Sequence, residues 1–253
     1  MKKRLFKLSK EIKTISISVL LLTLIFAFND KRPEFIFSAW FSNFFKTLFL
    51  VMAVVLCNLL GLRMAGGIFN EKIFPKIFGS HRFATLKKKT NIAGFREKPR
   101  SILPVIFLTP IFPLLVMLIS NGHIIIAAIH TFSTKVTKKV GKEFMHLEER
   151  QLSFIAMASI MFNLILLVIF KGAGIPAGVK ISSWFIFWNL LPIQDLIGSK
   201  MFFGTKILYT FFFIFTIFFI LLINLLSLWA LIPALILASI LTFWYFFKFE
   251  LPR

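Results

Sequence analysis

Long apolar runs alternate with short polar or basic segments along the chain of 253 residues. Only a helix satisfies its own backbone hydrogen bonds in hydrocarbon, so an apolar run long enough to cross a bilayer is expected to be helical. The pattern predicts an all-α polytopic membrane protein with about six or seven transmembrane helices. The predicted spans are 14–29, 43–62, 102–120, 152–170, 207–226, 228–247 and a shorter seventh segment, 181–193.

The stretch 207–247 is too long for one span, and Asn224, Ser227 and Pro233 predict a hairpin near its middle. Segment 181–193 has Pro192 near its end, which is typical of a short or broken helix. We expect the spans to form a single membrane domain, 1–253.

Composition excludes the other broad classes. Hydrophobic residues make up 58% of the chain, above the roughly 45–50% of soluble domains. Aromatic residues make up 17%, whereas disordered chains are poor in them. The single cysteine, Cys57, excludes an intrachain disulfide. The chain is therefore expected to be integral to the membrane.

Charge predicts the orientation. The chain has 30 Lys and Arg against 10 Asp and Glu, for a formal net charge of +20. Cytoplasmic loops are enriched in Lys and Arg, so we place the basic N-terminus and the basic loop 63–100 in the cytosol. No cleavage site of the A-x-A kind follows the first apolar run, which predicts an uncleaved first span.

The loop 63–100 is expected to bind the inner face of the membrane. Segment 66–79 mixes apolar and basic residues, which is typical of an interfacial helix, here broken at Pro75. Lys and Arg attract anionic lipid at the cytosolic face. An alternative partner is RNA, for example a ribosome, or an acidic protein. The basic patch consists of Lys72, Lys76, Arg82, Lys87, Lys88 and Lys89.

Segment 121–134 is too short and too β-branched for a helical span, and it predicts a strand or a re-entrant hairpin. Non-helical backbone at membrane depth is tolerated where it packs against protein or lines a wet cavity. The candidate edge-strand contact consists of His123, Ile124, Ile125, Ile126, Ala127 and Ala128.

Three motifs occur in a consistent order. Residues 189–200 carry Asn189-x-x-Pro192 followed by Leu-x-Gly-Ser-Lys, and residues 156–164 carry an Ala-rich helix with Asn163. Residues 122–128 carry a hydrophobic run that ends in Ala-Ala. Together these segments resemble the site-2 protease family of intramembrane zinc metalloproteases, in its archaeal and bacterial form. The resemblance covers about residues 45–206 and implies a helix bundle with a substrate-facing strand.

The catalytic motif of this family, His-Glu-x-x-His, places two zinc ligands on one helix face and a Glu that activates the metal-bound water. In the resemblance its two His positions fall on Cys57 and Gly61, its Glu on Asn58, and the third ligand, an Asp, on Ile197. All four positions are changed, so a zinc cofactor is not expected. Zinc rebuilt from Cys57 with His123, His130 or Asp195 remains an alternative.

The remaining polar positions have both structural and functional interpretations. Asn163 and Asn189 are expected to hydrogen-bond across neighbouring helices. Asp195 could reach a buried cavity, or it could be an interfacial residue exposed to water. In the functional interpretation Asn189, Pro192 and Asp195 shape the inner end of a cavity.

The sequence favours a proteolytically inactive protein of the site-2 protease type. Such a protein would bind membrane segments of other proteins, as a chaperone, an adaptor or a complex subunit, with residues 123–128 adding to a strand of the partner. The alternatives are an active intramembrane metalloprotease with displaced ligands, a transporter or channel, and a subunit associated with the ribosome or translocon.

Overall fold

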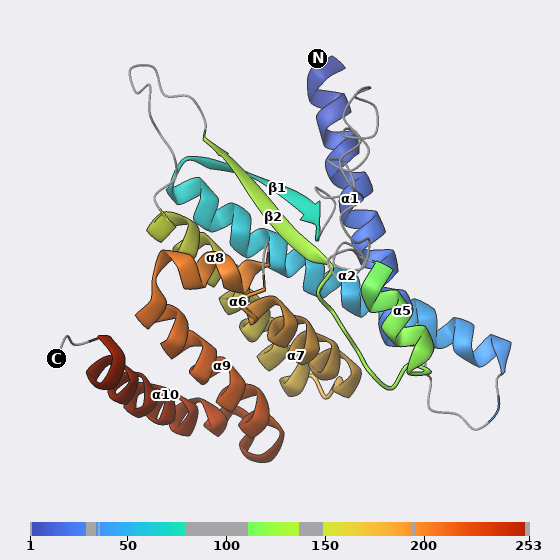
Figure 1. Ribbon diagram of the computed structural model, residues 1–253. Coiled ribbons are helices and arrows are strands. Elements are labelled where there is room, and N and C mark those ends of the chain that lie inside the picture. The colour runs from blue at the N-terminus through green and yellow to red at the C-terminus, as the bar shows by residue number, and fades with distance from the viewer. Residues whose placement is uncertain are drawn as a thin grey trace, which may run out of the picture. The chain divides into compact units, whose positions relative to one another are not determined.

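The computed structural model describes residues 2–28, 34, 36–78, 111–136, 149–193 and 196–250. Most of these residues are helical, as the sequence predicts (Figure 1). The chain divides into two compact units, where the sequence predicts a single domain. The first unit comprises 1–55 and 73–134, and the second comprises 56–72 and 135–253.

The first unit combines helices with a small sheet. Its elements are α1 (Lys2–Ala27), the first part of α2 (Phe37–Ile68), α5 (Ile111–Ile119), β1 (Glu71–Ile77) and β2 (His130–Val136). The two strands are neighbours in a two-stranded sheet. The backbone N–H of Phe78 donates to the carbonyl of Ile129 at 2.8 Å, which joins the end of β1 to the residue before β2. The strands are therefore antiparallel.

Strand β1 replaces the interfacial helix predicted for 66–79. Helix α2 continues to Ile68, and the chain then turns through Asn70, whose φ of 57° lies in the left-handed region. Side chains of β1 alternate, with Glu71 and Ile73 buried and Lys72 exposed. Because both strands of a two-stranded sheet are edge strands, Pro75 is tolerated within β1. The prediction of a helix here was wrong.

Glu71 is the acidic residue at the start of β1. It is buried, and its Oε2 has no hydrogen-bond partner among the described residues. Burial disfavours the charged form of a carboxyl group, and desolvation raises the pKa of Glu71 above its ordinary value of 4.5.

The strand predicted within 121–134 lies at the end of that segment. Strand β2 begins at His130, and residues 123–129 are not strand. A turn with positive φ at Asn121 and Gly122 follows α5. The next residues, 125–129, are buried, whereas His123 and Ile124 are exposed.

The second unit is a helix bundle. It consists of the last part of α2, α6 (Glu149–Gly172), α7 (Pro176–Leu190), α8 (Ile197–Gly204), α9 (Lys206–Leu226), η1 (Ser227–Ala230), α10 (Leu231–Tyr245) and the π-helical turn η2 (Phe246–Glu250). Helix α6 packs against α7 and α8 (Figure 1). The hydroxyls of Ser153 and Thr205 lie 2.8 Å apart and link the start of α6 to the end of α8.

Helices α9 and α10 form the predicted hairpin. Helix α9 ends at Leu226, and Ser227 adopts a φ of 52° at the break. Small residues recur every four positions along the face of α10 that is buried, and such residues allow close helix packing in membranes. They are Ala230, Ala234, Ala238 and Thr242.

Three of the described helical segments are long and apolar enough to cross a membrane by length and composition. They are Phe37–Ile68, Glu149–Gly172 and Lys206–Phe249, the last of which contains the α9–α10 hairpin. The chain is therefore a membrane protein. Helix α7 has 15 residues and ends before Pro192, as expected for a short segment.

Candidate functional site

The positions that correspond to the family's catalytic helix lie on the last part of α2, which packs against α6 within the second unit. The thiol of Cys57 donates to the main-chain carbonyl of Phe162 at 3.2 Å. A Cβ atom at Gly61 would lie 2.8 Å from the carbonyl oxygen of Ala158 and 3.1 Å from the Cβ of Phe162. Any larger residue at Gly61 would collide with α6, so the close approach of the two helices requires glycine here.

Asn58 lies at the centre of the buried face of α2. Its side chain is fully buried, and Leu62, one turn further on, is also fully buried. Neither the Nδ2 nor the Oδ1 atom of Asn58 has a hydrogen-bond partner among the described residues. An unsatisfied buried polar group costs about 1–3 kcal/mol. The amide of Asn58, unpaired among the described residues, therefore lowers the free energy of unfolding of the bundle.

Asn163 and Asn189 are also fully buried. The Nδ2 of Asn163 donates to the carbonyl of Ser159 at 3.1 Å, and the Nδ2 of Asn189 donates to the carbonyl of Phe185 at 2.9 Å. Both bonds lie within the residue's own helix, in contrast to the predicted bonds across helices. The Oδ1 atoms of both residues have no partner among the described residues. The second unit thus holds three buried amides, on α2, α6 and α7, with unmet hydrogen-bonding capacity.

The Leu-Ile-Gly sequence lies where α7 turns into α8. Ile197 is fully buried as the first residue of α8. A Cβ atom at Gly198 would collide with the main-chain carbonyls of Leu190 and Leu191. The hydroxyl of Tyr209 donates to the carbonyl of Leu190 at 3.1 Å and fixes the end of α7. Glycine is required by this tight connection.

The other predicted residues differ in their exposure. Pro192 is exposed in the α7–α8 connection, and Asp195 lies outside the described residues. Along the predicted edge-strand contact, Ile125, Ile126, Ala127 and Ala128 are buried within the first unit. Lys72 of the basic patch is exposed and Lys76 is half-buried. The rest of the patch lies outside the described residues: Arg82, Lys87, Lys88 and Lys89.

A zinc ion does not fit the positions at which the sequence resemblance would place its ligands. Of Cys57, Asn58, Gly61 and Ile197, the thiolate of Cys57 is the one usual zinc ligand, and its thiol is engaged by the Phe162 carbonyl. An imidazole at position 61 would find no space beside α6. Within the described ranges, no three His, Cys, Asp or Glu side chains gather where they could hold a metal ion.

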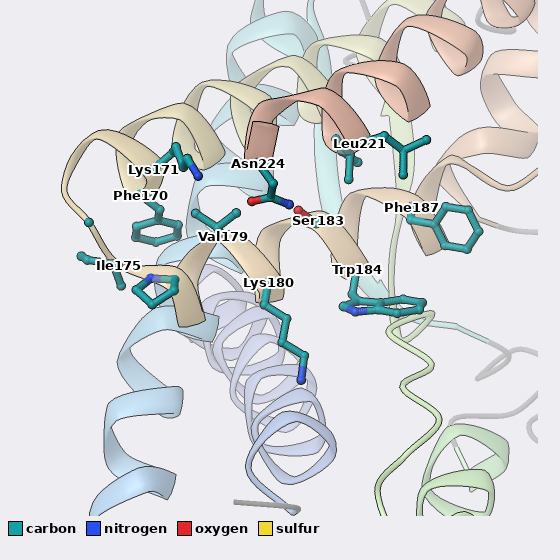
Figure 2. A pocket seen from close by; sticks show the side chains of 13 residues that line it. Phe170, Lys171, Ile175, Val179, Lys180, Ser183, Trp184, Phe187, Leu221 and Asn224 are labelled. Carbon is teal, nitrogen blue, oxygen red and sulfur yellow. The ribbon is translucent and has the colours of Figure 1, made fainter. Parts of the chain in front are cut away.

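A cavity of about 710 Å³ lies at another place in the second unit, where the α6–α7 turn meets the end of α9 (Figure 2). Aromatic and aliphatic side chains form most of its wall, and two lysines contribute to it. Sequence reasoning missed it. The available signal was the recurrence of Pro176, Lys180, Trp184 and Phe187 at helical spacing, which places them on one face of α7.

Comparisons with known proteins identify no relative. The chain matches no family model, no curated protein and no solved structure.

Proposed function

We propose that this chain is a site-2-protease-like integral membrane protein without proteolytic activity, which binds membrane-spanning segments of other proteins as an adaptor or complex subunit. It would have about six or seven spans, with α1, α5 and α7 added to the three long apolar segments. The N-terminus and the basic loop 63–100 would lie in the cytosol, because they hold most of the positive charge.

The observation that carries the binding function is the buried amide of Asn58, whose donor and acceptor both lack a partner among the described residues. In hydrocarbon, an amide side chain hydrogen-bonds to polar groups of a neighbouring helix, at about 1 kcal/mol per contact. An incoming segment must part α2 from its neighbours to reach Asn58. That opening is assisted because the amide gains a hydrogen bond that it lacks in the closed bundle.

The absence of proteolytic activity is supported by the four motif positions at which the catalytic residues are replaced, Cys57, Asn58, Gly61 and Ile197. Asn58 stands where a general base would be, and a carboxamide does not take up a proton at neutral pH. Gly61 has no side chain to ligate a metal and no room for one. Ile197 places a buried hydrocarbon side chain where the third ligand would lie.

The binding function can be tested with defined peptides in proteoliposomes. Two Leu-Ala transmembrane peptides would carry the same photo-crosslinker, and one of them would also carry a central Asn. We expect the Asn peptide to crosslink to the protein about fivefold more than the plain peptide, as about 1 kcal/mol per amide contact implies. Asn58→Leu should remove the preference. The matched control is Asn43→Leu, which makes the same change in the half-buried first part of α2.

Equal crosslinking of the two peptides would contradict the proposal. So would an Asn43→Leu control that loses the preference for the Asn peptide as fully as Asn58→Leu does. Proteolytic activity has a separate test. Stoichiometric zinc in purified protein that disappears in Cys57→Ser, together with cleavage of a membrane peptide, would establish the active protease instead.

A further inference from the structure

The cavity at the α6–α7 turn has one polar region and one apolar region. Figure 2 shows the Asn224 amide of α9 lying between Lys171 of α6 and Ser183 of α7. Phe170, Trp184 and Phe187 contribute aromatic surface to the wall. A ligand that fits both regions has a polar head and a hydrocarbon tail.

The position of the cavity matches the edge of a bilayer. Lys171 lies in the last turn of α6, and Asn224 lies in the last turn of α9. Both helices belong to segments long and apolar enough to span a membrane. Their shared end therefore lies at headgroup level, and the polar region of the cavity lies there with it.

The apolar region follows α7 inward. Helix α7 begins at Pro176, and Phe187 lies three turns further along it. At 1.5 Å per residue the cavity extends about 16 Å along the helix, close to half of the ~30 Å hydrocarbon thickness of a bilayer. This depth accommodates one acyl chain of a lipid within a single leaflet.

The charge of the lining selects an anion. Lys171 and Lys180 both line the cavity, and among the described residues that line it none is acidic. Between Arg150 and Phe249 the sequence holds one acidic residue, Asp195. The hydroxyl of Ser183 and the amide of Asn224 add donors that suit phosphate oxygens. Phosphate is therefore the headgroup chemistry that the lining complements.

We propose that this cavity binds an anionic phospholipid, with the phosphate beside Lys171 and Asn224, Lys180 adding positive charge to the same lining, and one acyl chain along Trp184 and Phe187. The site is separate from the buried amides of the proposed function. It also lies at the opposite end of the spans from Lys206 and Lys248, where α9 begins and the last helix ends.

The test uses the full chain in detergent and native mass spectrometry. Phosphatidylglycerol and phosphatidylcholine with identical acyl chains are added in limiting amounts, and bound lipid is counted. We expect phosphatidylglycerol to be retained about thirtyfold over phosphatidylcholine, because two lysines at roughly 1 kcal/mol each contribute about 2 kcal/mol. The double variant Lys171→Gln/Lys180→Gln should bind both lipids equally. The control Lys206→Gln/Lys248→Gln removes the same charge elsewhere and should keep the preference.

A further variant and a competitor distinguish the other outcomes. Leu221→Trp fills the apolar region without changing charge and should reduce retention of phosphatidylglycerol about tenfold. Glycerol phosphate, which has the headgroup chemistry without a tail, should not displace the lipid. The proposal is wrong if the two lysine pairs behave alike, if Leu221→Trp has no effect, or if glycerol phosphate alone empties the site.

Discussion

The thiol of Cys57 donates a hydrogen bond to the main-chain carbonyl of Phe162 across 3.2 Å, so α2 and α6 are joined at this position. A neutral hydrogen bond contributes about 0.5–1.5 kcal/mol to stability. We expect Cys57→Ala to lower the free energy of unfolding by about 1 kcal/mol, and Cys57→Ser to retain most of it. Reversible unfolding in mixed micelles measures both. An equal loss in the two variants would show that the sulfur packs without donating.

Gly61 sets how closely α2 approaches α6. Gly61→Ala places a Cβ atom 2.8 Å from the carbonyl of Ala158, and the helices must separate to accept it. Overpacking of this kind costs about 1–3 kcal/mol, and we expect a fall of that size in the free energy of unfolding. Gly67→Ala is the matched control, because nothing lies within 4 Å of a Cβ there in the same helix. The control should be neutral or stabilising by about 0.5–1 kcal/mol.

Asn58→Leu should change the stability of the protein and its binding of the Asn-containing peptide in opposite directions. The change removes two buried polar atoms that lack partners among the described residues and keeps the number and branching of the side-chain heavy atoms. We expect the free energy of unfolding to rise by about 1–3 kcal/mol, while binding of the Asn-containing peptide falls. Asn224→Leu, at an exposed position on α9, should change stability by less than about 0.5 kcal/mol. A destabilised Asn58→Leu protein would mean that the amide has a partner in the membrane.

Gly198→Ala tests the α7–α8 connection. The added methyl group meets the main-chain carbonyls of Leu190 and Leu191, which cannot move as a side-chain end can. We expect a cost above about 3 kcal/mol, beyond ordinary overpacking, and loss of the folded protein in a thermal unfolding assay. Gly172→Ala has open space around its Cβ and should leave the melting temperature within a few degrees of the parent.

Glu71 predicts a pH dependence of stability. Because burial raises the pKa of Glu71 above 4.5, the folded state binds a proton more tightly than the unfolded state. The free energy of unfolding should therefore fall as pH rises from 4.5 through the raised pKa. It should remain at this lower value at neutral pH. Glu71→Gln should be more stable than the parent at pH 7 and lose that advantage near pH 4. Glu34→Gln removes the same charge at an exposed residue and is the matched control.

Hydrophobic runs predict the helices well, because a span in hydrocarbon has a simple length requirement. The break at Ser227 and the short helix before Pro192 both lie where the sequence places them. Strand β1 was missed because Pro75 and two lysines within an apolar segment suggest a broken amphipathic helix. The alternation of buried Glu71 and Ile73 with exposed Lys72 is seen in the structure, and the sequence does not reveal it because Glu71 and Lys72 are both charged.

The candidate site was only partly predictable. The sequence identifies Gly61 and Gly198 as motif positions, but their need for glycine comes from carbonyl groups on other segments, which no local pattern reveals. The amides of Asn163 and Asn189 were expected to bond across helices, yet their donors bond within their own helix. Which carbonyl an amide selects depends on side-chain rotamers and helix spacing, and neither can be inferred from the order of residues.

The row of small residues formed by Ala230, Ala234, Ala238 and Thr242 has a consequence for how α9 and α10 assemble in the membrane. It packs α10 against α9, the element that precedes it in the chain, through a turn of four residues. Contacts between segments so close in sequence form fast, because little chain entropy is lost in closing the turn. The two C-terminal helices can thus pair as they enter the bilayer together.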